Sequence, residues 1–181
     1  MFNVQYITFI SNYKNIKLEC SVVRKILGRT ENTTDIWFTP KEIITKLGPF
    51  DLDPCTELER PWDTATRHFT KEDDGLNQKW IGTVWCNPPY GTQTKIWLEK
   101  MAQHNNGIAL VFARTETKMF FDHVWPRARG VLFIEGRLRF CNKDGKPGKT
   151  NSGAPSVLIA YGNDALSKLE SSNIPGKLIY L

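Results

Sequence analysis

The chain has few of the residues that build metal sites or disulfide frameworks. Its 181 residues include four cysteines and three histidines. The cysteines stand far apart, without a Cys-x-x-Cys pair or a neighbouring histidine pair, so we expect no metal. Scattered cysteines also favour a reducing compartment, and we expect a cytoplasmic location.

Long apolar runs are absent as well. No run approaches the roughly 20 residues that cross a bilayer, and the first residues lack the pattern of a secretory leader, so we expect no membrane partner. Hydrophobic residues make up 40% and charged residues 24% of the chain, which is ordinary for a globular protein. The length favours one domain with a sizeable core.

Acidic residues are outnumbered, and the net charge is +5. Residues 1–30 contain five basic residues against one acidic residue, so much of the excess lies there. This balance is compatible with a polyanionic partner but is weak support by itself. We predict a basic N-terminal extension over residues 1–34, with a strand at 4–10, and one domain over residues 35–181.

The predicted domain alternates strands and helices. "TPKEIITKLG" (39–48) predicts a helix with Thr39 as N-cap, Pro40 at the first helical position and Gly48 as the stop. Further elements are strands at 49–54, 83–86, 107–113 and 130–136, and helices at 94–104 and 116–125. Continuous apolar strands between helices indicate an α/β fold with a mostly parallel sheet covered on both faces. Residues 137–140 and 155–162 predict an antiparallel hairpin at its edge, joined by a long basic loop.

Polar residues follow three of these strands. They are Asp51 and Asp53, then the group from Asn87 to Tyr90, then Ala113 to Thr115. Ligands of open α/β sheets bind at the carboxyl ends of the strands, so these groups are expected to line one crevice.

The stretch "TVWCNPPYG" (83–91) combines a stiff turn with unusual chemistry. Pro88 and Pro89 remove two backbone donors and hold Asn87 extended. The segment therefore presents two acceptors, the Asn87 side-chain oxygen and the Pro88 carbonyl, beside the flat ring of Tyr90. Two hydrogen bonds donated by an NH₂ group to these acceptors would draw its nitrogen out of conjugation and make it nucleophilic. An ordinary strand-to-loop turn is the alternative.

"NPPY" after an apolar strand resembles the catalytic motif of S-adenosylmethionine-dependent amino methyltransferases. An ordered set of segments resembles the Dam-like DNA N6-adenine methyltransferases of phages and prophages: "DIWFTP" (35–40), "PFDLDPC" (49–55), "HFTKEDDGL" (68–76), "VWCNPPYG" (84–91), "ARTETKMFFDHVW" (113–125) and "FIEGRLRF" (133–140). The resemblance implies a Rossmann-like methyltransferase sheet acting on double-stranded DNA in a bacterial host. Methylation of RNA or protein glutamine, and a non-catalytic DNA-binding protein with this fold, stay open as alternatives.

The resemblance assigns the catalytic group. Asn87 and Pro88 would accept the N6 hydrogens of an extruded adenine, Tyr90 would stack on the base, and Pro89 would hold their geometry. No strong general base is required, because the proton can leave after attack.

The resemblance also assigns the cofactor and DNA contacts. Residues placed at S-adenosylmethionine are Trp37, Thr39, Pro40, Asp53, Pro54, Cys55, Asp74 and Asn87. Asp53 could instead accept backbone bonds at its strand end, and Asp74 could lie in a solvated turn. "DPCTELERPWDT" lacks the Gly-rich turn that many methyltransferases have after the first strand. Candidates for phosphate contacts, or else ordinary surface charge, are Arg114, Arg137, Arg139, Lys143, Lys146 and Lys149.

Overall fold

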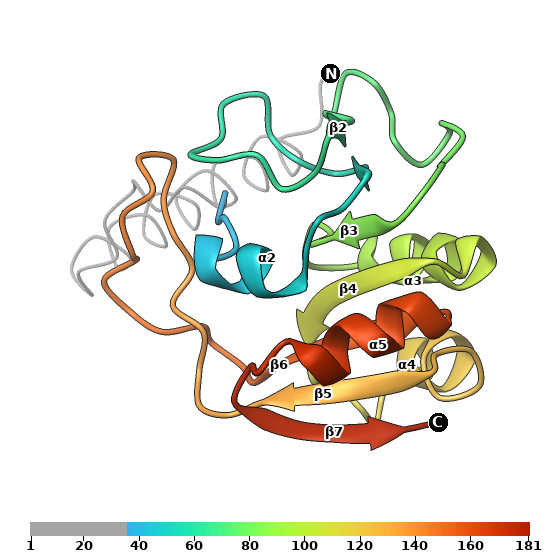
Figure 1. The fold of residues 1–181 in the computed structure, drawn as a ribbon. Helices are drawn as coiled ribbons and strands as arrows, with labels where there is room; N and C mark the ends of the chain where they lie inside the picture. Colours follow the sequence, from blue (N-terminus) through green and yellow to red (C-terminus); the bar gives the residue numbers. More distant parts are fainter. Residues whose placement is uncertain (1–35) are drawn as a thin grey trace, which may run out of the picture. The chain divides into compact units, whose positions relative to one another are not determined.

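A computed structural model describes residues 36–181, which fold into a seven-stranded mixed sheet with helices on both faces (Figure 1). The helices are α2 (Lys41–Leu47), α3 (Thr94–His104), α4 (Lys118–His123) and α5 (Asn163–Ser171). The strands are β1 (Leu52–Asp53), β2 (Arg67–His68), β3 (Val84–Cys86), β4 (Gly107–Phe112), β5 (Gly130–Ile134), β6 (Ser156–Tyr161) and β7 (Gly176–Tyr180). The predicted extension over residues 1–34 and the predicted strand at 4–10 lie outside the described residues.

The strand order is β2-β1-β3-β4-β6-β5-β7. Neighbours from β2 to β4 are parallel, whereas β6 runs antiparallel to both β4 and β5, and β7 runs antiparallel to β5. The prediction was a mostly parallel α/β sheet with an antiparallel C-terminal edge, and the α/β class, the parallel core and the antiparallel edge are confirmed.

The predicted partners of the edge hairpin are wrong. Residues 137–140 form no strand, and β6 lies inside the sheet between β4 and β5. Every residue of β6 is buried, which requires a neighbouring strand on each side. The edge is β7 instead, whose residues are mostly exposed.

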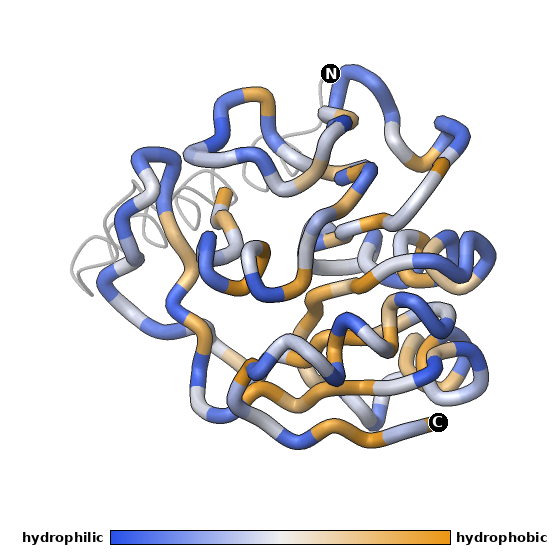
Figure 2. The backbone as a smooth tube through the Cα atoms, viewed as in Figure 1, coloured by the Kyte–Doolittle hydropathy of each residue, from blue (hydrophilic) through white to orange (hydrophobic). Residues whose placement is uncertain are grey.

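Side chains alternate between two cores on the two faces of the sheet. On one face, Leu98, Met101 and Phe120 of α3 and α4 pack with Val84 and other strand residues. On the other, α2 and α5 pack against residues that include Trp85. Figure 2 shows hydrophobic stretches running through the central strands, as expected for strands buried on both faces.

Most element boundaries predicted within residues 36–134 are confirmed to within a few residues, and α3 spans the predicted range. The predicted helix cap is wrong by one residue, because the N-cap of α2 is Pro40 and no side chain caps this helix. Three elements were not predicted, namely β2, α5 and β7. No helix within residues 36–181 is long and apolar enough to cross a membrane.

Because Met101 is fully buried between α3 and the sheet, Met101→Ala is expected to lower the free energy of unfolding by about 2–5 kcal/mol. Urea denaturation measures the change. Glu99→Ala on the exposed side of the same helix is the matched control and should change stability by less than about 0.5 kcal/mol. Equal losses in the two variants would contradict the position of α3 on the sheet.

Candidate active site

Three parallel strands bring the predicted site groups to one edge of the sheet. β3 lies between β1 and β4, with Leu52 opposite Val84 and Cys86 opposite Ala109. Their carboxyl ends therefore lie together, and Asp53, Asn87 and Ala113 stand at or just beyond these ends.

The loop after β3 is tied to the helix that follows it. The Thr94 hydroxyl at the start of α3 donates a hydrogen bond of 2.8 Å to the Pro89 carbonyl. Asn87 Oδ1 is buried and accepts no hydrogen bond from the described residues. A buried acceptor without a donor costs about 1–3 kcal/mol, so this oxygen is an exception that calls for an explanation.

Tyr90 belongs to an aromatic cluster. Its ring stacks on Phe112 at the end of β4, with 4.2 Å between ring centroids and 13° between planes. Phe140 approaches edge-on with a centroid distance of 6.5 Å. Tyr90 is nevertheless 42% exposed, so a flat ligand can still reach its ring.

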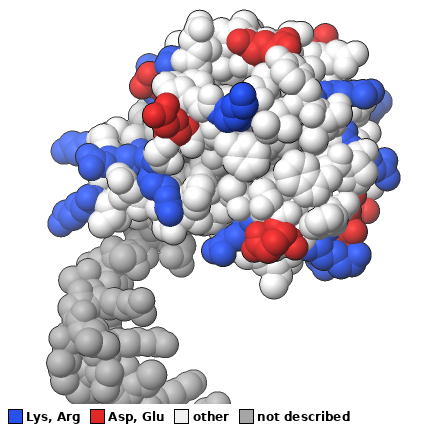
Figure 3. All heavy atoms as spheres, turned by 90° about the horizontal axis from the view of Figure 1, so that it is seen from below, with Lys and Arg blue, Asp and Glu red and all other residues white. Residues whose placement is uncertain are grey.

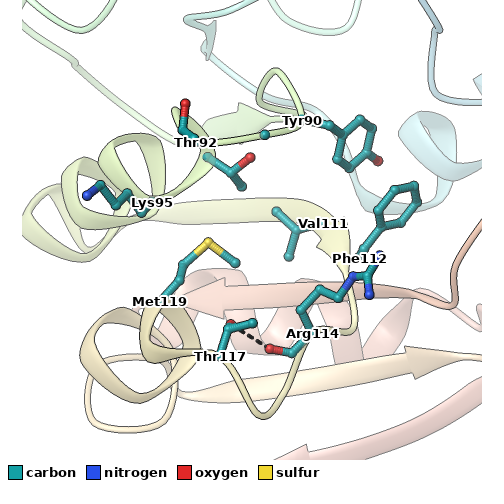
Figure 4. A pocket seen from close by; sticks show the side chains of 10 residues that line it. Tyr90, Thr92, Lys95, Val111, Phe112, Arg114, Thr117 and Met119 are labelled. Atoms are coloured by element: carbon teal, nitrogen blue, oxygen red, sulfur yellow. Dashed lines mark hydrogen bonds between the residues drawn. The ribbon is translucent and has the colours of Figure 1, made fainter.

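Two cavities meet at the stacked pair Tyr90 and Phe112. The smaller, of about 230 Å³, is bordered by further aromatic rings, Trp37 and Phe140, and by the loop residues 150–153. The larger, of about 470 Å³, lies towards α3 and α4, with Val111 and Met119 in its wall (Figure 4).

Asp53 is a buried carboxylate held by the segment that follows it. One oxygen accepts from the Cys55 backbone N–H at 3.1 Å and the other accepts from the Thr64 hydroxyl. Burial raises the pKa of Asp53 from 3.8 to about 6, against the lowering effect of these hydrogen bonds and of Arg60. The carboxylate therefore has the predicted strand-end hydrogen bonding, and each oxygen retains a lone pair for a further donor.

Cys55 and Cys86 join the ends of β1 and β3. Their sulfur atoms are 3.7 Å apart. The contact with Cys86, together with burial, raises the pKa of the Cys55 thiol well above its usual value. Cys55 thus stays protonated and serves packing between the two strands.

The segment from Asp74 to Leu76 is clamped against the end of β1. A Cβ on Gly75 would lie 1.9 Å from the Pro54 carbonyl oxygen, so only glycine fits there. Lys100 Nζ on α3 donates to the carbonyls of Leu76 at 2.5 Å and Gln78 at 2.6 Å. The glycine that permits close backbone approach at β1 thus comes from this segment rather than from residues 53–64.

Asp74 lies in an exposed turn with a φ of 51°. Its carboxylate accepts from the Asn77 side-chain amide at 2.7 Å. The backbone at Asp74 therefore forms the solvated turn that was the alternative prediction. The Asp74 carboxylate is nevertheless accessible to a ligand.

Trp37 and Thr39 reach the same region from the segment before α2. Phe38 pairs with Cys141 through two backbone hydrogen bonds, which places this segment beside the basic loop. Trp37 lines the smaller cavity. Thr39 is 3% exposed, and its hydroxyl has no hydrogen-bond partner among the described residues, so it is a second buried polar atom without a partner. Pro40 ends the segment as the N-cap of α2.

The basic residues predicted at DNA lie beyond the carboxyl ends of β4 and β5, with Arg114 just after β4 and the other five in the loop between β5 and β6. All six are exposed: Arg114, Arg137, Arg139, Lys143, Lys146 and Lys149. Arg137 donates to the Ser152 carbonyl at 3.3 Å, and the Lys143 ammonium lies 3.9 Å from the Glu59 carboxylate. Figure 3 shows one group of basic side chains at the left of the face it views and others at its centre, right and lower rim, with acidic side chains among them.

Several residues that shape the site were not predicted, namely Phe112, Phe140, Gly75 and Lys100. Phe112 ends an apolar strand and looked like ordinary core, and Phe140 was read as part of a strand. The position of Lys100 on α3 gave no indication of its partners, because residues 75–78 are distant in sequence.

The mixed sheet, with polar groups at the carboxyl ends of its parallel strands, places the chain in the class of α/β proteins. Residues 28–167 match the family described as DNA N-6-adenine-methyltransferase (Dam). This match covers most of the 181 residues, and the chain belongs to this family. The family methylates the N6 of adenine, and its substrate is DNA. Neither the curated proteins nor the solved structures contain a match to the chain.

Lys100→Met is expected to loosen the segment from Asp74 to Gln78. The variant loses charge-assisted hydrogen bonds to backbone carbonyls, each worth about 1.5–3 kcal/mol, and amide exchange there should become about 10–100 times faster. Hydrogen–deuterium exchange with peptide resolution measures this. Lys95→Met, exposed on the same helix, is the control and should leave the segment unchanged. An unchanged exchange rate in Lys100→Met would show that the lysine does not hold the segment.

Asp53→Asn is expected to change how stability depends on pH. The folded pKa of about 6 lies above the unfolded value near 3.8, so the folded protein binds more protons and loses stability as pH rises from 4 to 6. Relative to the variant, the wild type should lose roughly 2–3 kcal/mol over this range. Urea denaturation at pH 4, 5, 6 and 7 tests this. If the free energies of unfolding of the two proteins differ by the same amount at every pH, Asp53 is not protonated near pH 5.

Proposed function

We propose that this protein transfers a methyl group from S-adenosylmethionine to the N6 amine of an adenine extruded from double-stranded DNA. The observation that carries the proposal is the buried Asn87 side-chain oxygen without a donor, in the loop that leads to the exposed ring of Tyr90. A flat ligand with an NH₂ group satisfies both features, and adenine is the base on which the family acts.

The aromatic cluster suits an extruded base. Phe112 already covers one face of Tyr90, so adenine stacks on the opposite face, in the smaller cavity bordered by Trp37 and Phe140. Stacking of a base on an aromatic side chain is worth about 1–3 kcal/mol, which offsets part of the few kcal/mol that unpairing requires.

The two acceptors prepare the amine for attack. Asn87 Oδ1 and the Pro88 carbonyl each accept one N6 hydrogen, and the nitrogen lone pair turns out of conjugation towards the methyl donor. Pro89 stiffens the loop and its carbonyl is held by Thr94, so the acceptors stay in place without substrate. Positioning of this kind is a large part of catalysis for a displacement reaction.

The surroundings of Asn87 fit S-adenosylmethionine, which supplies a methyl group on a positively charged sulfur. The Asp53 carboxylate provides a buried negative charge, and the unpartnered Thr39 hydroxyl provides a free hydrogen-bonding group. Residues that would hold the cofactor are Trp37, Thr39, Pro40, Asp53, Pro54, Cys55, Asp74 and Asn87. We place it at the carboxyl ends of β1 and β3, as in Rossmann-like sheets.

DNA contacts are assigned to exposed cations. Residues 1–34, as a basic extension of the domain over 35–181, add charge for the phosphates. Phosphate contacts within the described residues come from Arg114, Arg137, Arg139, Lys143, Lys146 and Lys149. These contacts hold the duplex while the pocket selects the base.

Asn87→Ala is expected to lower methyl transfer by about 100-fold or more, since one of two acceptors for the amine is lost. The measurement incubates the protein with labelled S-adenosylmethionine and unmethylated duplex DNA, with RNA and protein as alternative acceptors. With the wild type, the label should appear in DNA as N6-methyladenine, and circular dichroism should show that the variant keeps its fold.

Asn163→Ala is the matched control and should leave methyl transfer unchanged. Asn163 begins α5 after the carboxyl end of β6, which is antiparallel to β4, so it lies away from the carboxyl ends of β1, β3 and β4. Label found only in RNA or protein would refute the DNA substrate. Full transfer by Asn87→Ala would refute the role of the amide but would not contradict DNA as the substrate.

A further inference from the structure

The larger cavity beside Tyr90 has no role in methyl transfer as proposed above. Its volume is about 470 Å³ and most of its lining is apolar, with Val111 and Met119 among the wall residues. Figure 4 shows Met119 and Val111 in the middle of the cavity, with Lys95 and Arg114 at its opposite ends.

The two cations are available to an anionic ligand. Both are exposed, and neither forms an ion pair within residues 36–181. The backbone at Arg114 is fixed, because the Thr117 hydroxyl donates to the Arg114 carbonyl at 2.6 Å. An apolar hollow with one unpaired cation at each end fits a flat apolar group linked to negative charges on two sides.

Tyr90 and Phe112 line both cavities. Their rings form a single stacked unit with centroids 4.2 Å apart. Consecutive nucleotides of a DNA strand are joined by one phosphate, so a strand with its target adenine in the smaller cavity has its next nucleotide within reach of the larger one. Aromatic side chains that separate neighbouring bases act as wedges of the kind that unstack DNA steps.

We propose that the larger cavity binds the nucleotide next to the target adenine in the same strand. Its base lies against Val111 and Met119, where the thioether suits contact with an aromatic ring. Its two flanking phosphates lie near Lys95 and Arg114. This assignment rests on the proposed function, since it takes the smaller cavity as the place of the target base.

The test uses single strands built from abasic phosphodiester units, so that no recognition sequence is needed. One strand carries no base, a second carries one adenine, and two more carry the adenine with a thymine directly 5′ or 3′ of it. Fluorescence anisotropy gives the affinity of the full chain for each. In the wild type, thymine on one side should tighten binding about fivefold or more.

Filling the cavity should abolish this gain. Met119→Trp, and separately Thr92→Trp from the exposed rim in case the first variant does not fold, should bind the two-base strand no more tightly than the one-base strand. Phe121→Trp on the same helix as Met119, at a side chain that is 62% exposed, is the control and should keep the gain.

The outcomes separate the two proposals. If the folded cavity-filling variants retain the gain, or if thymine adds nothing on either side in the wild type, the neighbouring nucleotide does not bind there. The smaller cavity is tested separately by the gain in affinity of the one-adenine strand over the base-free strand. This gain should be lost in Tyr90→Ala. An adenine that adds no affinity in the wild type counts against the proposed function.

Discussion

The parallel pairing of β1, β3 and β4 is the constraint on which the site depends. Because β3 lies between the other two strands, Asp53, Asn87 and Arg114 reach the same edge although they are distant in sequence. The pairing is stabilised by burial on both faces, because Val84 and Trp85 point into different cores. The edge is therefore set by the packing of the whole domain rather than by the loops that carry the chemistry.

Around this edge the protein holds polar groups in a partly unsatisfied state. Asn87 and Thr39 keep buried oxygens without partners, and Asp53 is buried deeply enough for its pKa to rise to about 6. Each of these features costs stability in the free protein. The surrounding clamps, from Thr94 to the Pro89 carbonyl and from Lys100 to the segment after Asp74, keep the groups from relaxing towards one another.

The elements that were predictable are those with a clear local pattern. Strands β3, β4 and β5 are continuous apolar runs, and α3 has both periodicity and clear boundaries. The α5 sequence also buries Ala165 and Leu169 at helical spacing, so this helix too has a local pattern. β7 had little pattern to find, because an edge strand is mostly exposed and takes its conformation from pairing with β5.

The sequence by itself indicated the family through its ordered segments, and it predicts the acceptor pair at Asn87 and Pro88 beside the ring of Tyr90. It did so because proline geometry and side-chain type act locally. The tertiary structure alone decided that Phe112 and Phe140 surround Tyr90, that Gly75 rather than a glycine after β1 permits close approach, and that β6 separates β4 from β5. These contacts join residues far apart in the chain, and they form only when the strands and helices pack together in the folded domain.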